Sequence, residues 1–141
     1  MAFQQNATPT FTKQPQASRV TIAVADTTTA KTVLTAGPNG SKLIGLFAST
    51  TDTSLSNIQV SITNGGTQYN MWVVPIPLTS GTAAASPSSV NLLNATDAVG
   101  LPVDNDGNPF LYLVSGDTLT VNALATLAAG IVTVHAIYAD F

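Results

Sequence analysis

The stretch from residue 110 to residue 141 (FLYLVSGDTLTVNALATLAAGIVTVHAIYADF) constrains the fold more than any other part of the sequence. Apolar and polar residues alternate in it twice, across residues 118–123 and again across residues 132–138. A period of two is that of an extended strand with one face on a core. The linking segment ALATLAA (123–129) has some propensity for a helical turn. Strands on both sides of it favour a hairpin with a wide loop.

Shorter strand patterns precede this stretch, and turn-forming residues separate them. We expect strands at residues 19–25, 31–36, 41–50, 57–63, 67–78 and, more weakly, 90–93. Asn64-Gly65-Gly66 predicts a hairpin, because Asn and Gly tolerate positive φ. Pro75 and Pro77 cannot donate to a ladder, so the later part of 67–78 should lie at a sheet edge or leave the sheet.

These patterns, with no convincing helix among them, predict an all-β fold. We expect a single-domain β-sandwich or jelly roll of about seven or eight antiparallel strands, spanning residues 19–141. Residues 1–18 are polar, contain two prolines and show no periodicity, so they are expected to form an extended N-terminal arm. Phe3 and Phe11 in this arm favour docking on a neighbouring molecule, since aromatic residues are scarce elsewhere.

The segment SKLIGLFAST (41–50) is apolar on both of its faces. Strict alternation places Leu43 and Phe47 on one face and Ile44 and Leu46 on the other. A strand that is apolar on both sides is covered twice, once by its own core and once by something else. The second cover is either a partner subunit or the opposite sheet, and we predict Ile44 and Leu46 as interface residues.

Charge is scarce: charged residues make up 8% of the 141-residue chain, against roughly 25% in ordinary soluble domains. All acids are aspartates, and the formal net charge is −3. Without a cluster of Lys and Arg, there is no reason to expect a nucleic-acid partner. Either hydroxyl and amide groups solvate a surface so poor in charge, or other subunits cover much of it, and we favour the second explanation.

Cysteine and targeting patterns narrow the class further. The chain contains no cysteine, which excludes disulfides and thiolate metal sites. Residues 2–17 lack the basic and apolar regions of a signal peptide, and no apolar run approaches the roughly 20 residues of a membrane span. We therefore expect a soluble protein with no membrane partner.

Catalytic patterns are absent, so we predict that the chain is not an enzyme. The single histidine, His135, lies within a strand pattern, and no nucleophile elbow accompanies it. A packing or interface role is the more common one for such a residue. No phosphate-binding glycine motif follows a strand, and no cofactor is expected.

Two features leave alternatives open. Asp104-Asn105-Asp106-Gly107-Asn108 resembles a calcium loop superficially but lacks the spacing of an EF-hand. It is interpreted as an Asx-rich turn, and whether Asp104 and Asp106 bind calcium stays open. Tyr69 and Trp72 could stack on a sugar, although packing in a core or an interface is the commoner use of Trp.

A set of short motifs in the last forty or so residues gives the chain a family resemblance. They are Asp104 followed by GNPF (107–110), GDTLTV (116–121), AG (129–130), VTV (132–134) and DF (140–141). This succession resembles that of capsid decoration (cement) proteins encoded beside the capsid genes of tailed phages. The opening TFTKQPQ (10–16) is similar in type to the arms of such proteins, and the middle of the chain matches only in its rhythm of strands.

The resemblance implies a virion structural protein made in the host cytoplasm. Such a protein would bind the major capsid protein on the outer capsid surface as a homotrimer and stabilise the shell. The predicted interface residues are then Phe3, Phe11, Ile44, Leu46, Tyr69 and Trp72. The first alternative is a phage head-fibre or tail-associated module that binds a glycan receptor through Tyr69, Trp72 and the 79–89 loop. A secreted adhesin and, last, a hydrolase are the remaining alternatives.

Overall fold

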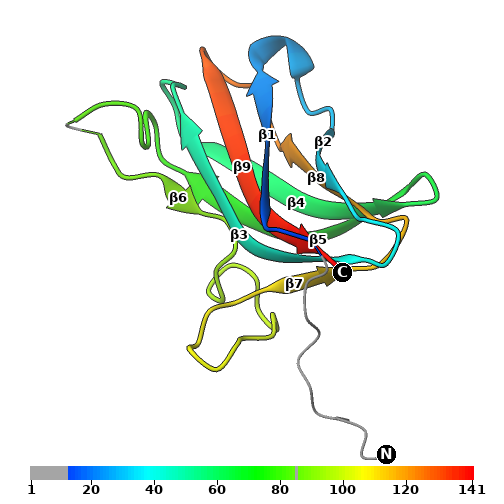
Figure 1. The fold of residues 1–141 in the computed structure, drawn as a ribbon. Coiled ribbons are helices and arrows are strands. Elements are labelled where there is room, and N and C mark those ends of the chain that lie inside the picture. The colour runs from blue at the N-terminus through cyan, green and yellow to red at the C-terminus, as the bar shows by residue number, and fades with distance from the viewer. Residues whose placement is uncertain (1–12, 85) are drawn as a thin grey trace, which may run out of the picture.

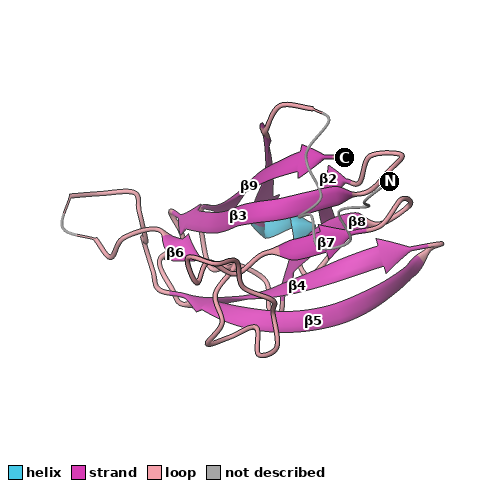
Figure 2. Cartoon of the chain, turned by 60° about the horizontal axis from the view of Figure 1, so that its bottom comes forward, coloured by secondary structure: helices cyan, strands magenta, loops and turns pink. Residues whose placement is uncertain are grey.

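The computed structural model describes residues 13–84 and 86–141, and its strands form two sheets packed face to face (Figures 1 and 2). One 3-10 turn, η1 (Val24–Asp26), lies among these described residues. The strands are β1 (Gln16–Ala23), β2 (Lys31–Thr35), β3 (Ser41–Thr50), β4 (Ser56–Asn64), β5 (Thr67–Ile76), β6 (Val90–Asn91), β7 (Leu111–Leu113), β8 (Thr118–Ala123) and β9 (Ile131–Asp140).

The strand order is that of a jelly roll. The first sheet has the order β1-β9-β3-β6, with β7 also paired to β3, and the second has the order β2-β8-β4-β5. The chain passes from one sheet to the other between β1 and β2, β2 and β3, and β3 and β4, and returns in the same manner at its C-terminal end. Because β6 and β7 are short pieces beside the same strand, the described strands fill the eight positions of a jelly roll. The predicted all-β sandwich is confirmed.

The expected hairpin between residues 118 and 138 is wrong. β8 pairs with β2 and β4 in the second sheet, whereas β9 pairs with β1 and β3 in the first. The segment between them therefore crosses from one sheet to the other instead of reversing within one. Both strands are central in their sheets, and this explains why their alternation is so regular: each buries one face on the common core.

The core follows the predicted alternation in most strands. Val121 on β8 and Val132 and Val134 on β9 are completely buried. On β5, Trp72 is buried in the same core, and its indole Nε1–H donates to the Leu92 carbonyl at 2.8 Å. The buried indole thus ties the edge of the second sheet to the segment after β6.

A β-bulge in β3 reverses the alternation that strict period two predicts. Leu43 pairs with Tyr138 of β9 but Gly45 pairs with Ile137, so Ile44 is the extra residue. A bulge shifts every later side chain to the other face. Leu46 consequently points into the core at 1% exposure, while Ile44 and Phe47 are exposed to solvent at 41% and 37%.

The remaining turn and edge predictions agree with the structure. Asn64 pairs with Thr67 across a two-residue turn in which Gly65 and Gly66 both have positive φ. β5 is the outermost strand of the second sheet, and Pro75 lies within it. β1 begins at Gln16, so the end of the segment expected as an arm is already strand. The predicted docking residues Phe3 and Phe11 lie outside the described residues.

Candidate functional site: the outer face of the first sheet

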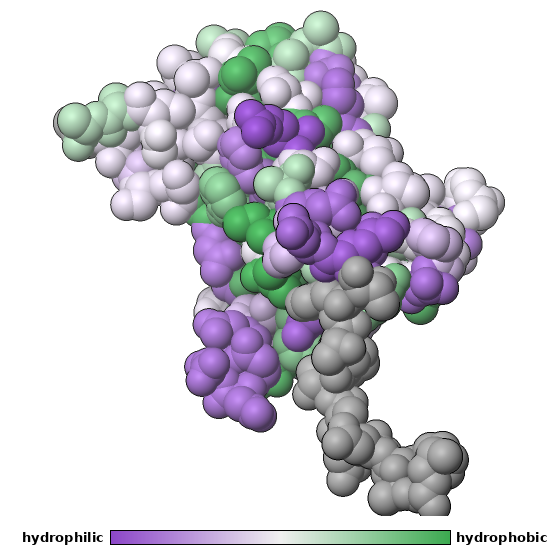
Figure 3. Space-filling view, in the orientation of Figure 1, coloured by the Kyte–Doolittle hydropathy of each residue, from purple (hydrophilic) through white to green (hydrophobic). Residues whose placement is uncertain are grey.

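The outer face of the first sheet presents apolar and aromatic side chains in rows across β1, β9 and β3. The register places Arg19, His135 and Phe47 in one row, and Ala17, Ile137 and Gly45 in the next. Cross-strand partners share a face of the sheet, so these side chains form one surface. In the space-filling view, hydrophobic groups cross the middle of this face over β3 and β9, between hydrophilic groups on both sides (Figure 3).

The centre of this surface is a stacked ring pair. The rings of Phe47 and His135 lie 4.9 Å apart at an interplanar angle of 11°. Ile137, 38% exposed, is the neighbour of Gly45, where a Cβ would approach the Ile137 Cβ to 3.4 Å. The Ile137 Cγ1 and Cδ1 would also lie within 3.7 Å of that Cβ, so the Ile137 side chain packs over the glycine.

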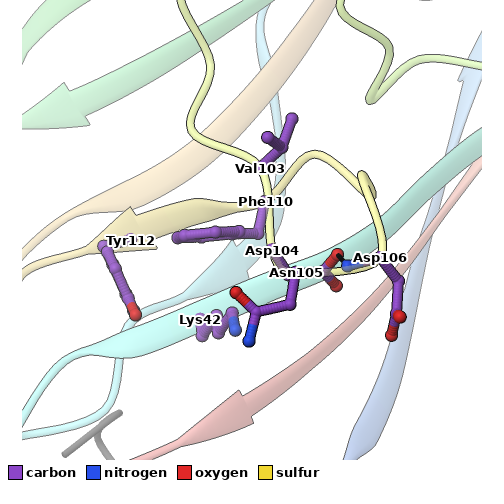
Figure 4. Close-up of a pocket in the computed structure, with 7 residues that line it drawn as sticks. All are labelled: Lys42, Val103, Asp104, Asn105, Asp106, Phe110 and Tyr112. Carbon is purple, nitrogen blue, oxygen red and sulfur yellow. Dashed lines mark hydrogen bonds between the residues drawn. The ribbon is translucent and has the colours of Figure 1, made fainter.

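Toward the C-terminal end of β9, a cation and three aromatic rings continue the surface. The Lys42 ammonium lies 4.3 Å from the centroid of the Phe110 ring and 5.9 Å from that of Tyr112. Tyr112 makes an edge-to-face contact with Phe110 at 5.0 Å and a tilted contact with Phe141 at 5.9 Å. Figure 4 shows Lys42 beside the two rings and below the loop that carries Asp104 and Asn105. We call the two parts together the aromatic face.

Three open hollows run along this part of the surface. One of about 420 Å³ lies between Lys42, Phe110, Tyr112 and the 103–106 loop. Tyr112 also borders a second, of about 560 Å³, with Val114 and Phe141. The third, of about 480 Å³, is lined by Ile44, Phe47 and the 108–109 turn. Their open form suits the side chains of a protein partner better than an enclosed small molecule.

The 104–108 loop has the Asx-turn structure that the sequence predicts. The Asp104 Oδ1 accepts the amide N–H groups of Asp106 and Asn108, each at 2.9 Å. The N–H donors from Asn108 and Asp106 lower the pKa of Asp104, with a smaller contribution from the charge of Lys42. No group of three or more His, Cys, Asp or Glu side chains that could hold a metal occurs in residues 13–84 and 86–141. The Asp104 carboxylate thus organises its own loop.

Other aspartate side chains also accept hydrogen bonds that connect separate segments of the chain. The buried Asp52 accepts hydrogen bonds from Thr53 N, Ser56 Oγ, Ala128 N and Ala129 N. Burial raises its pKa, but these hydrogen bonds outweigh burial and the pKa is lowered from its ordinary value of 3.8. Asp117 accepts from Asn64 and from the Val114 N–H, and Asp140 accepts from Ser41. These carboxylates stabilise the fold and do not converge on one of the hollows.

The outer face of the second sheet has a different chemistry. Ser61, Gln68, Asn70 and Asn122 are linked by side-chain hydrogen bonds of 3.1–3.4 Å. Thr63 and Thr120 are joined in the same way at 3.3 Å. Amide and hydroxyl groups that bond to one another in this way satisfy their hydrogen-bonding capacity without charge. This part of the second sheet is therefore more polar than the aromatic face.

The interface residues predicted from the sequence lie in different parts of the structure. Ile44 lies on the aromatic face, and Tyr69 is 58% exposed near the tip of the β4–β5 hairpin. Leu46 and Trp72 are core residues, for the reasons given above. Phe47, Ile137, Lys42 and Tyr112 were not predicted, because strict alternation places Phe47 on the face of the core residue Leu43 and does not show the bulge. Within the described residues, no helix has the length and apolar character needed to cross a membrane.

Comparison with known proteins gives similarities at the level of structure alone. No family model matches the sequence, and no characterised protein matches it significantly. A chain of the acidic stable capsid structure of Helicobacter pylori bacteriophage KHP30 has a TM-score of 0.47 and 10% identity, covering 90% of this chain and 88% of that one. A chain of the cyanophage Pam1 capsid asymmetric unit has a TM-score of 0.47 and 15% identity, covering 100% and 98%.

A further similar structure comes from another kind of protein. The Drosophila NLP core, whose structure concerns pentamer formation and histone binding, has a TM-score of 0.46 and 11% identity, covering 91% of this chain and 98% of that one. Two of these three structural neighbours are thus phage capsid chains. At such TM-scores and identities, the similarities by themselves define no function for this chain.

Proposed function

We propose that the chain is a virion structural protein, a capsid decoration protein that binds the outer surface of a phage capsid and stabilises the shell. The observation that carries the proposal is the aromatic face, where Ile44, Phe47 and Ile137 are each more than a third exposed on regular strands. Soluble monomers rarely leave a contiguous apolar surface of this kind uncovered. A docking partner would cover it.

The sequence supports the same proposal independently. The motifs that resemble decoration proteins lie in residues 104–141, and this segment contributes Phe110, Tyr112, Ile137 and Phe141 to the aromatic face. The motif residues Asp104 and Asp140 hold the loop and the strand end that flank these rings. The resembling segment therefore overlaps with the candidate docking surface, to which β3 adds Lys42, Ile44 and Phe47.

The mechanism that follows is mechanical and not chemical. The rigid sheet would place its aromatic face on the major capsid protein, and each copy would bridge neighbouring capsid subunits. A standard interface buries about 1,600 Å². Repetition of such contacts by the symmetry of the shell would oppose its expansion. A homotrimer, which we also propose, would multiply the contacts of each bound particle.

Quantitative mass spectrometry of purified virions tests the proposal. A decoration protein is expected at hundreds of copies per particle, scaling with the number of capsid subunits. A handful of copies would instead support a fibre or tail component, and absence from virions would refute a virion role altogether. Light scattering coupled to size exclusion tests the trimer, and a monomer at micromolar concentration would exclude it.

The glycan-binding alternative now depends on Tyr69. Its ring is 58% exposed, as required of a side chain that stacks on a sugar. Trp72, expected to share this role, is buried and hydrogen-bonded to Leu92. A glycan array screened with wild-type protein and Tyr69→Ala would test the alternative. Binding that Tyr69→Ala abolishes would favour a receptor-binding module over decoration.

A further inference from the structure

Charge on the aromatic face is unbalanced, and the imbalance defines the chemistry of its partner. In the described part of the chain, ion pairs join Lys13 to Asp140 and Lys31 to Asp26. The two remaining basic residues, Arg19 and Lys42, form no ion pair there, and both lie on the aromatic face. A chain with a net charge of −3 therefore presents its unpaired positive charges on one surface.

The acidic residues near the aromatic face do not fully neutralise its positive charges. Asp140 is buried at its edge and is bonded to Ser41 and Gln16. Asp104 is the acid whose pKa responds to Lys42, but its oxygens accept hydrogen bonds from its own loop. Asp104 thus partly balances the charge of Lys42, whereas no acid forms an ion pair with Arg19 within the described residues. The charge of Arg19 is therefore the less balanced of the two.

The register fixes how the two cations are spaced. Arg19 is level with His135 of β9, and Lys42 is level with Ala139. Four residues along an antiparallel strand and two strand spacings across it separate their Cα atoms by about 17 Å. Ile137 of β9 lies midway between these two positions, and Phe47 lies beside that diagonal, in the row of Arg19 and His135. The surface therefore has an apolar centre, with one cation on each side of it along a diagonal across the three strands.

We propose that the partner of the aromatic face is an acidic protein surface, in which two carboxylates flank an apolar centre and pair with Arg19 and Lys42. Charge complementarity selects this partner over a nucleic acid, because two separated cations are too few to follow a phosphate backbone. It also selects it over a second apolar surface without charge, which would bury Arg19 unpaired at considerable cost. The inference rests on the proposed decoration function, which makes the capsid surface the partner.

The test measures binding of the full chain to capsids of the encoding virus assembled without this protein. Arg19→Glu is expected to weaken binding by about tenfold or more, since a like-charge contact replaces a pair. Lys42→Met, which keeps an aliphatic side chain but removes the ammonium group over Phe110, is expected to weaken it less. Wild-type affinity should fall as salt is raised from about 0.05 M to about 0.5 M, because exposed charge pairs are screened.

Controls separate charge on this face from total charge and from folding. The double variant Ser54→Glu/Thr67→Glu changes the net charge by the same amount as Arg19→Glu, at exposed positions in the β3–β4 loop and at the β5 end of the hairpin. It should bind like wild type. Ile137→Ser should weaken binding at every salt concentration, because it removes apolar area. Thermal unfolding of each variant verifies that its fold is intact.

The outcomes are distinguishable. Capsid binding that is insensitive to salt and to Arg19→Glu would overturn the acidic partner while leaving the decoration function standing. Equal losses from Arg19→Glu and from the charge control would also overturn it, because total charge would then explain both. Failure of wild-type protein to bind capsids at any salt concentration would refute the decoration function, and with it the partner.

Discussion

Asp52 is predicted to be the carboxylate on which the corner of the jelly roll depends most. It is fully buried between the β3–β4 loop and the segment that crosses from β8 to β9. Its Oδ1 accepts from Thr53 N at 2.8 Å and Ala129 N at 2.9 Å, and its Oδ2 accepts from Ser56 Oγ at 3.0 Å and Ala128 N at 3.3 Å. One side chain thus satisfies donors from two loops that are distant in sequence.

The magnitude follows from counting the donors that each substitution leaves without an acceptor. Asp52→Ala leaves the three backbone N–H groups and one hydroxyl unpaired. Because the losses are not additive, the expected decrease in the free energy of unfolding is about 3–5 kcal/mol. In Asp52→Asn the amide can point at Ser56, whose hydroxyl can rotate to accept, so the main loss is the long contact to Ala128. A decrease of about 1–3 kcal/mol is expected.

Equilibrium unfolding in urea, followed by far-UV circular dichroism, measures both variants. The exposed Asp106 provides a matched control, since Asp106→Asn removes the same charge and should leave the midpoint unchanged. The expected order of stability is wild type, then Asp52→Asn, then Asp52→Ala. A decrease of less than about 1 kcal/mol for Asp52→Ala would refute the reasoning, because unpaired buried donors cost at least that much. A lower free energy of unfolding for Asp52→Asn than for Asp52→Ala would refute it as well.

The remaining predictions concern pH, a glycine and the tryptophan. Because the pKa of Asp52 is lowered from 3.8 in the folded protein, its contribution to stability is complete above that value and is lost as pH falls below it. Unfolding free energies measured from neutral to acid pH should therefore fall more steeply for wild type than for Asp52→Asn, and parallel curves would contradict this. At Gly130 (φ +81°) an added Cβ would lie 2.9 Å from the Thr51 carbonyl oxygen, whereas at Gly107 (φ +84°) it would meet nothing within 4 Å. Gly107→Ala should cost about 1 kcal/mol, the conformational term alone, and Gly130→Ala about 1–3 kcal/mol more from the contact; equal thermal shifts would exclude a steric contribution. Trp72→Phe removes the donor to the Leu92 carbonyl and should cost about 2–3 kcal/mol in urea unfolding followed by circular dichroism, and a neutral result would show that this hydrogen bond contributes nothing.

The sequence predicts where the strands lie far better than it predicts which strands meet. Alternation is a local property, so residues 41–50 are recognised with the bounds of β3. The sheet that a strand joins depends on partners distant in the chain. β8 and β9 are therefore misread as a hairpin, although each pairs with earlier strands instead. Short connections favour hairpins, and the wide 124–130 segment is long enough to cross between sheets.

The candidate site is less predictable, for two physical reasons. The bulge at Ile44 exchanges the faces of Leu46 and Phe47. No residue type in SKLIGLFAST predicts a bulge, although Gly45 is compatible with a bulge. The aromatic face also gathers Lys42, Tyr112 and Phe141 from separate parts of the chain. Only the pairing of β3 with both β7 and β9 brings them together.

The pairing of β1 with β9 also determines when this protein can fold. Gln16 lies opposite Tyr138, so β1 pairs with a strand whose residues follow it by as many as 122 positions in the sequence. Ribosomes add about 5–20 residues per second, and β1 and β3 therefore wait several seconds with the central place of their sheet empty. The central position of the first sheet can therefore be filled only after β9 has been synthesised.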